Sequence, residues 1–175
     1  QDTFGMNMVA LVDGQPRLLN LKQALECFLS HRREVVTRRT VFELRKARER
    51  GHILEGLAVA LSNVDEIIAL IKAAPTPPDA KRSLMARDWR SPVVEEMLLR
   101  AASDASRPDG LAPEFGLSAQ GYRLSDAQAQ AILELRLQRL TGLEQDKIVG
   151  EYKEVMDKIV DLLDILAKPE RITAI

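Results

Sequence analysis

The feature that most constrains the fold is a long stretch without proline, from Leu21 to Ser62. A continuous α-helix of roughly 40 residues is about 60 Å long, at about 1.5 Å per residue. A rod of that length cannot be a core helix of one small domain, so we expect it to pack along a partner. Asn20 and Gln23 form a capping-box pattern, which predicts that the helix begins at Leu21.

Apolar residues recur along this rod in a stripe typical of a helix packed against another helix. Leu21, Phe28, Val35 and Phe42 follow one another at seven-residue steps, and we predict that Phe28, Val35 and Phe42 form one side of a seam. Cations interrupt the stripe, namely Arg32, Arg39 and Lys46.

Two glycines follow in the same predicted helix, Gly51 and Gly56. Each weakens a helix by about 1 kcal/mol relative to Ala. They indicate a bend or hinge, a close approach of another segment, or simply tolerated glycines.

A second rod is predicted near the C-terminus, opened by a capping-box pattern at Thr141 and Glu144. Its apolar residues are spaced as in a heptad repeat. We predict that they form the other side of the seam: Ile148, Tyr152, Val155, Ile159, Leu162 and Leu166.

The two rods carry opposite charge. Residues 31–50 have a net charge of +5, and residues 144–164 have a net charge of −4. Burial of seam side chains at about 1.5–3 kcal/mol each outweighs exposed ion pairs of about 0–1 kcal/mol. We therefore predict an antiparallel pair that is stabilised by apolar contacts, with the charges selecting partner and direction. The alternative is that the basic run contacts nucleic acid directly.

Shorter elements surround the rods. Apolar runs at 6–12 and 17–20 flank Asp13-Gly14-Gln15-Pro16, which predicts a β-hairpin in which Pro16 stops the ladder. Asn63 is predicted to cap a short helix, and Thr76 and Ser91 to precede two more within a proline-punctuated segment of helices and loops at 75–120. Trp89 is expected to anchor this globular knot. Ser125 and Gln128 predict a capped helix over 126–140.

Two segments of the knot carry more apolar surface than one interface can use. The helix at 126–140 has Leu133, Leu137 and Leu140 on one side and Ala131, Ile132 and Leu135 on another, and residues 53–63 are apolar nearly all round. A contiguous apolar patch predicts a self-association surface, most simply a two-fold dimer contact. The candidate gate residues are Ile53, Leu57, Leu61, Ile132 and Leu135. The alternative is that one copy encloses them all.

Several function classes are excluded by residues that the sequence lacks. A net charge of −1 does not suit a general polyanion binder. The single Cys27 excludes an internal disulfide and is expected to be inert core, and no apolar run is long enough for a membrane span. There is no phosphate-binding glycine loop, and His31 and His52 lack the spacing of metal ligands. We therefore predict no catalytic, metal-binding or cofactor-binding residues.

The chain begins Gln-Asp-Thr, without an initiator Met or a signal peptide. We expect it to be a fragment of a longer cytoplasmic protein, inactive as an enzyme on its own.

Two long strings, HRREVVTRRTVFELRKARERGHILEGLAVALSNVDEIIALI (31–71) and QAQAILELRLQRLTGLEQDKIVGEYKE (128–154), closely resemble the A subunits of bacterial DNA gyrases. The resemblance covers essentially the whole chain, and A-type subunits of topoisomerase IV are the alternative. It implies a type IIA topoisomerase, which passes one DNA duplex through a double-strand break in another and, in gyrase, uses ATP to introduce negative supercoils.

The resemblance also implies partners. The parent would be an A2B2 complex that binds DNA, with ATP and Mg bound through the B subunit, and this segment would form its exit gate, or C-gate, as a homodimer. Neither Tyr122 nor Tyr152 stands in a context like that of the DNA-cleaving tyrosine, so no catalytic residue is carried over.

The predicted fold is mainly α, with a long antiparallel coiled coil, a small helical knot at one end and an N-terminal β-hairpin. The expected parts are the hairpin at 1–20, coiled-coil arms at 21–62 and 141–168, the gate knot at 63–140 and a tail at 169–175. A stand-alone coiled-coil adaptor and a basic-helix nucleic-acid binder are the alternatives from other functional classes.

Overall fold

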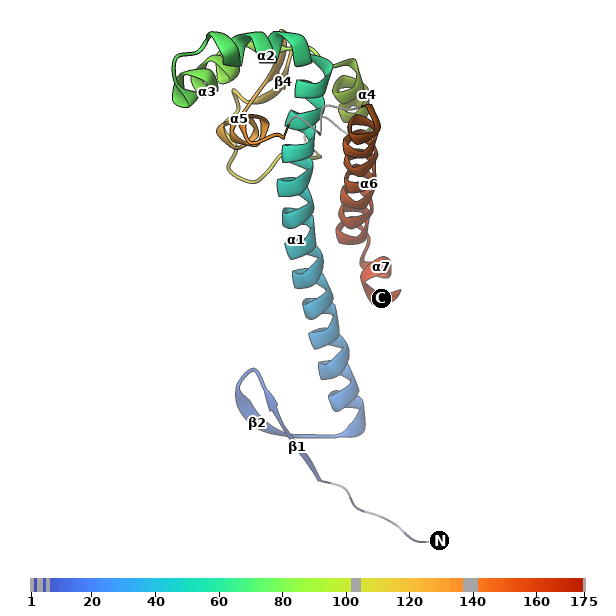
Figure 1. Cartoon of the computed structure of the whole chain (residues 1–175). Helices are drawn as coiled ribbons and strands as arrows, with labels where there is room; N and C mark the ends of the chain where they lie inside the picture. Colours follow the sequence, from blue (N-terminus) through green and yellow to red (C-terminus); the bar gives the residue numbers. More distant parts are fainter. Residues whose placement is uncertain (1, 3–4, 6, 102–104, 137–141, 175) are drawn as a thin grey trace. The chain divides into compact units, whose positions relative to one another are not determined.

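The structure, a computed structural model, describes residues 2, 5, 7–101, 105–136 and 142–174 (Figure 1). It is mainly helical, as predicted, with two small antiparallel sheets. The chain divides into two compact units: residues 1–41 with 165–175 form the first, and residues 42–164 form the second. Helix α1, Leu21–Ser62, belongs to both units.

The first unit contains the predicted β-hairpin, formed by β1 (Met8–Val12) and β2 (Gln15–Leu19). Asp13 and Gly14 connect the strands with φ angles of 54° and 76°, as a two-residue hairpin turn with two left-handed positions requires. The expectation that Pro16 stops the ladder is wrong, because Pro16 pairs with Leu11. Both strands of a two-stranded ribbon have a free edge, where the missing N–H of proline is tolerated.

Helix α1 begins as predicted. The Gln23 amide N–H donates to Asn20 Oδ1 at 2.8 Å, and the Asn20 N–H donates to Gln23 Oε1 at 3.0 Å. This reciprocal capping box satisfies two of the N–H groups that the first turn of a helix leaves without partners.

Within the first unit, the buried side of α1 differs from the predicted seam. Phe28 and Val35 are 59% and 37% exposed, whereas Val36 and Thr40 are buried. Successive residues of a helix lie about 100° apart around its axis, so the buried stripe runs along a different face from the seven-residue stripe. The Cys27 side chain, expected in a core, is half-buried.

The expected tail contains a helix of its own, α7 (Pro169–Ala174). Ile172 and Thr173 of α7 line a shallow groove together with Arg33 and Thr37 of α1. The C-terminal segment therefore contacts α1 within the first unit. Ile165 is buried in this unit, and Leu166, a predicted seam residue, is half-buried.

The second unit holds the end of α1, most of α6 and the knot between them (Figure 1). Its further helices are α2 (Val64–Ala73), α3 (Pro77–Met85), α4 (Pro92–Ala101), α5 (Asp126–Leu133) and α6 (Gly142–Ala167). A small sheet of order β3-β5-β4 joins them, with β3 at Asp88–Trp89, β4 at Gly116–Ser118 and β5 at Gly121–Arg123. This sheet was not predicted, since its strands are too short to produce an alternating pattern.

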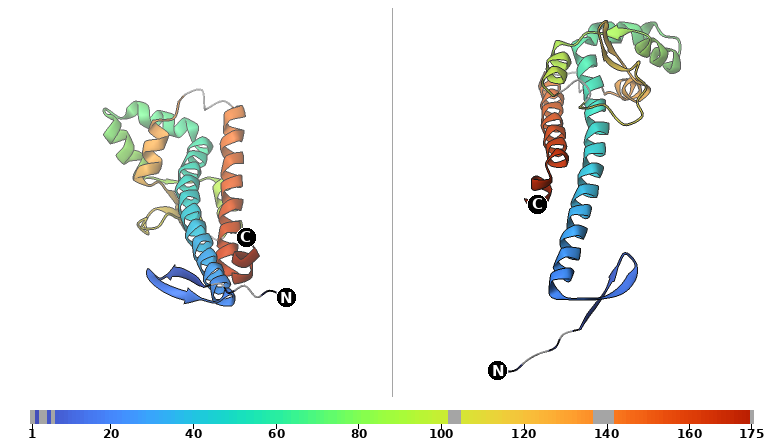
Figure 2. Two further views of the ribbon diagram at one scale, coloured as in Figure 1. Left: turned by 90° about the horizontal axis from the view of Figure 1, so that it is seen from below. Right: turned by 180° about the vertical axis from the view of Figure 1, so that it is seen from behind.

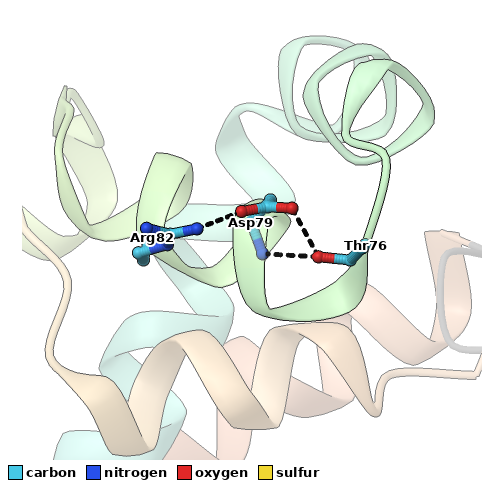
Figure 3. Close-up of polar contacts among 3 residues, drawn as sticks. All are labelled: Thr76, Asp79 and Arg82. Carbon is cyan, nitrogen blue, oxygen red and sulfur yellow. Dashed lines mark hydrogen bonds and ion pairs between the residues drawn. The ribbon is translucent and has the colours of Figure 1, made fainter.

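Two predicted local features of the knot are confirmed. The Thr76 hydroxyl accepts a hydrogen bond from the Asp79 N–H at 3.3 Å and donates one to the Asp79 carboxylate. The same carboxylate pairs with Arg82 within α3 (Figure 3). The Trp89 indole is 2% exposed, and its Nε1–H donates to the Leu84 carbonyl at 2.9 Å. Trp89 is thus a packing anchor, with its polar atom satisfied.

Helices α1 and α6 lie side by side in the second unit, as both Figure 1 and Figure 2 show. Arg50 Nε donates to Glu151 at 2.8 Å, and Lys158 pairs with Glu43 at 3.5 Å. The contacts therefore occur in opposite order along the two helices. The Arg50–Glu151 pair has the predicted polarity and the Lys158–Glu43 pair reverses it, whereas Arg38 pairs with Glu34 of its own helix.

Most predicted seam residues of α6 are buried, namely Ile148, Tyr152, Ile159 and Leu162, and Val155 is half-buried. On α1 the buried residues of this unit include Leu44, Ala47 and Leu54, whereas the predicted Phe42 is 52% exposed. The cations of Arg45 and Lys46 lie 5.6 Å and 6.0 Å from the centre of the Phe42 ring. Cation–π contacts of this kind stabilise an aromatic ring at the surface.

Candidate functional site

The second unit has an apolar groove of about 280 Å³ at its surface. It is bounded by the end of α1, by α2 and by the end of α5. The lining residues are Ala60, Leu61, Val64, Ile67, Ile68, Ile71, Lys72, Ile132, Leu133 and Leu135. We call this surface the apolar groove.

Three of the predicted gate residues line the apolar groove: Leu61, Ile132 and Leu135. The other two lie outside its lining. Leu57 is 6% exposed, and Ile53, one turn earlier on α1, is half-buried. The structure therefore brings together three of the five predicted gate residues, from the end of α1 and from α5 and the turn after it, whereas Ile53 and Leu57 do not line the groove.

Helix α2 supplies groove residues that were not predicted from the sequence. Val64, Ile67, Ile68 and Ile71 follow the i, i+3, i+4, i+7 pattern of one helix face. Ile67 is buried, and the others are half-buried. The apolar periodicity of α2 was a sufficient signal for predicting that this helix has an apolar face at the surface.

A sharp turn between α1 and α2 brings the groove walls together. The Asn63 side-chain amide donates to the carbonyls of Val59 and Arg90, both at 2.9 Å. As predicted, Asn63 is the N-cap residue of α2, although its side chain makes no capping hydrogen bond. The Asn63 amide group satisfies backbone carbonyls at the bend, and its bond to Arg90 links the bend to the segment after β3.

The third wall depends on how α5 ends. The helix predicted over 126–140 ends at Leu133, and residues 134–136 are not helical. The Leu135 N–H donates to the Ile132 carbonyl at 3.1 Å, an i to i+3 bond that tightens the chain after the last helical turn. This turn places Leu135 at the groove. Leu137 and Leu140 lie outside the described residues.

The start of α5 is fixed by the predicted capping box. The Ser125 hydroxyl accepts from the Gln128 N–H at 3.3 Å, and the Ser125 N–H donates to Gln128 Oε1 at 2.9 Å. Both residues are buried, with Gln128 at 0% exposure. A capping residue in the interior of a knot needs partners for all its polar atoms.

Gln128 finds those partners on α1 and β5. Its Nε2 lies 2.7 Å from the His52 carbonyl, 2.7 Å from the Tyr122 hydroxyl and 3.2 Å from His52 Nδ1. With Nδ1 as acceptor, the neutral imidazole carries its hydrogen on Nε2, which lies 2.7 Å from the Ser125 hydroxyl. Neutral His52 is thus bonded to the first turn of α5 through both ring nitrogens.

The same network continues to Glu55, one turn along α1. Its carboxyl group accepts from the Ser106 hydroxyl at 2.7 Å and is hydrogen-bonded to Tyr122. Arg107, beside it, donates to the carbonyls of Leu111, Ala112 and Phe115, and so holds the following loop. We call the group His52, Glu55, Ser106, Tyr122, Ser125 and Gln128 the polar network.

Burial shifts the pKa values of both titratable groups on α1 toward the neutral forms. The pKa of His52 falls from 6.5 to about 4, because of burial and then the nearby Arg107 charge. Burial raises the pKa of Glu55 from 4.5 to about 7, against the opposing effects of Ser106, Tyr122 and Arg107. The lone acid in the apolar run 53–63 was a signal for a buried carboxyl group that went unused in predicting this site.

A glycine allows this network to form. A Cβ atom on Gly56 would lie 2.6 Å from Cγ and 2.7 Å from Cβ of Gln128, closer than real contacts allow. At Gly51 the corresponding contacts, to Ile159 and Val155, are 3.4 Å. Of the alternatives for Gly56, the structure therefore shows a close approach, in which α5 packs against the backbone of α1.

The described residues also show what this site lacks. Tyr122 and Tyr152 are 1% and 0% exposed, and burial raises the pKa of both hydroxyls. Within the described part of the chain, His, Cys, Asp and Glu side chains form no group of three that could hold a metal ion. None of the described helices is both long and apolar enough to cross a bilayer. His31 lies exposed on α1.

Comparison with known proteins gives one consistent result. The DNA gyrase/topoisomerase IV A-subunit family matches residues 1–175. The chain is 62% identical to the DNA gyrase A subunit of Pseudomonas aeruginosa over 98% of its length, and 62% identical to that of Neisseria gonorrhoeae over 100%. Identity to the Escherichia coli protein is 60% over 87% of the chain. The chain spans 19%, 19% and 17% of these three relatives.

Proposed function

Because the chain belongs to the family of DNA gyrase and topoisomerase IV A subunits, we propose that it is the segment through which such a protein self-associates. The observation that carries the proposal is the apolar groove, in which Lys72 is the one polar residue among the ten described lining residues. Half-buried aliphatic side chains gain about 25 cal/mol for each Å² of apolar surface that a partner covers. A second copy offers the same surface in a two-fold contact.

The arms of this gate are proposed to be an antiparallel coiled coil of residues 21–62 and 141–168. The opposite order of the Arg50–Glu151 and Lys158–Glu43 contacts supports this arrangement. So do the buried positions Ile148, Tyr152 and Ile159, which follow the heptad spacing along α6. A pair of stiff arms suits a gate whose two halves must meet at a small surface.

In the full-length protein, the proposed role is the exit gate, or C-gate, of a type IIA topoisomerase that passes one duplex through a double-strand break in another. By similarity to the DNA gyrase A subunits, that enzyme would introduce negative supercoils in the cytoplasm, as an A2B2 complex with ATP and Mg bound through the B subunit. The chain alone is proposed to be inactive, since its two tyrosines, Tyr122 and Tyr152, are both buried.

The test is the oligomeric state of the chain, measured by sedimentation velocity with light scattering at tens of micromolar. We expect the wild-type chain to be a dimer and Leu135→Asp to be a monomer, because the substitution puts an unpaired charge into the contact. The matched control is Val160→Asp, at an apolar position of α6 that is 46% exposed and outside the groove. A monomeric wild-type chain, or a Leu135→Asp variant as dimeric as the control, would refute the proposal.

A further inference from the structure

We infer that Gln128 is the positioning residue of the apolar groove. It fixes α5 against α1 and so sets the affinity of the groove for its partner, without lining the groove itself. The effect on affinity rests on the proposed function, whereas the position of α5 depends only on contacts within the single chain.

One side chain makes an unusual number of bonds here. Gln128 accepts the Ser125 N–H through Oε1, and its Nε2 faces the His52 carbonyl, His52 Nδ1 and the Tyr122 hydroxyl at 2.7–3.2 Å. These partners belong to the first turn of α5, to α1 and to β5. A fully satisfied buried amide with partners on separate elements fixes their relative position.

The steric fit of Gln128 adds to these bonds. Gln128 packs on Gly56 so closely that a methyl group in place of the glycine hydrogen would overlap its side chain. The hydrogen bonds and the contact with Gly56 therefore define one position of α5 against the α1 backbone, rather than a sliding contact.

Helix α5 depends on this anchor because it is short. An isolated helix of fewer than about 12 residues is marginal in water, and α5 comprises eight residues. Its other buried residues are Ala129 and Ile132. Ile132 lies one turn after Gln128 on the same side of the helix and lines the groove. A shift of α5 at Gln128 therefore shifts the wall that Ile132 and Leu135 form.

The experiment compares Gln128→Met with Gln130→Met in the full chain. Methionine keeps the approximate length of glutamine and removes its hydrogen bonds. Gln130 lies two residues along the same helix, is exposed, and bonds to Glu134 rather than to α1. We expect Gln128→Met to weaken the dimer about tenfold, the effect of losing roughly one net buried hydrogen bond, and Gln130→Met to leave the dissociation constant unchanged.

Amide hydrogen exchange of the diluted, monomeric chain separates positioning from general stabilisation. In Gln128→Met we expect faster exchange in α5, residues 126–133, by about tenfold. Exchange in α6, over residues 152–164, is expected to stay at the wild-type rate. A residue that merely stabilised the fold would raise both rates together.

Each outcome of the dimer and exchange measurements either supports or overturns the inference. Unchanged exchange in α5, equal increases in α5 and α6, or an unaltered dimer constant despite faster exchange in α5 would overturn it. If the wild-type chain does not dimerise at all, the proposed function and the claim about affinity both fail, and the exchange comparison alone decides whether Gln128 positions α5.

Discussion

The apolar groove and the polar network lie at the two ends of the same short helix, α5, and their composition is the reverse of what solvent exposure alone would favour. The groove is lined almost entirely by aliphatic side chains, most of them half-buried. The network consists of polar side chains with 0–5% exposure. A contiguous apolar patch at a surface is typical of an interaction site, whereas polar residues enclosed within a chain need hydrogen-bond partners inside it. The two regions therefore have different proposed tasks: the groove would provide association, and the network would fix the geometry of α5.

The largest expected effect concerns the pH dependence of the network. In the folded chain His52 and Glu55 are both neutral between about pH 4.5 and 6.5, whereas in the unfolded chain both are charged. The His52 contribution to stability is complete above pH 6.5 and is lost as the pH falls toward 4. The Glu55 contribution is complete below pH 4.5 and is lost as the pH rises through 7. Between pH 4.5 and 6.5 the two slopes cancel.

Replacing either His52 or Glu55 should reveal the pH dependence that the other residue gives to the free energy of unfolding. In Glu55→Gln, the free energy of unfolding should fall by about 3 kcal/mol as the pH is lowered from 6.5 to 4.5, since a pKa difference of one unit corresponds to about 1.4 kcal/mol. In His52→Gln it should fall by a similar amount as the pH is raised over the same interval. Urea denaturation at several pH values measures both slopes.

The control for this experiment is His31→Gln, an exposed histidine on the same helix, whose profile should match that of the wild type. Parallel profiles for all the variants would mean that His52 and Glu55 are not held neutral in the folded chain. The polar network would then not be shielded from solvent, and its contrast with the apolar groove would be lost.

The second prediction tests the steric side of the network. Gly56→Ala should destabilise the chain by about 2 kcal/mol, because overpacking against Gln128 costs more than the roughly 1 kcal/mol that alanine contributes to helix propensity. Gly51→Ala, with contacts of 3.4 Å, should change stability by less than about 1 kcal/mol. Thermal unfolding of the two variants measures the difference, and equal effects would show that Gln128 yields to the added methyl group.

Elements set by local chemistry were predictable from the sequence. The long α1 follows from the absence of proline and the Asn20 capping box, the hairpin from Asp13-Gly14, and the starts of α3 and α5 from Thr76 and Ser125. For the hairpin turn and for each helix start, the determining residues lie within four positions of one another. The end of α5 was not predictable in this way, since its helical sequence continues beyond Leu133 and the chain nevertheless turns toward the groove.

Features set by contacts between distant residues were predicted in part or missed. The heptad pattern identified buried positions on α6, but on α1 two faces carry apolar residues, and the pattern selected the exposed one with Phe28, Val35 and Phe42. Gln128 was identified as a cap, but its bonds to His52 and Tyr122 span 76 and 6 positions and left no local signature. The gate residues of the groove remain a proposal, which the association experiments test.

The smallest expected effect on folding belongs to the groove. Ile68→Ala should lower the free energy of unfolding of the monomeric chain by only about 1 kcal/mol, because Ile68 is half-buried and its truncation leaves no closed cavity. The same substitution should weaken the dimer about tenfold, since the lost apolar contact lies in the proposed interface. Val160→Ala, at a position 46% exposed outside the groove, should change neither quantity appreciably. Urea unfolding at low concentration and sedimentation velocity at high concentration measure the two effects. A loss of monomer stability near about 3 kcal/mol would show that Ile68 is core of the single chain, and the groove would then be interior rather than a surface kept for a second copy.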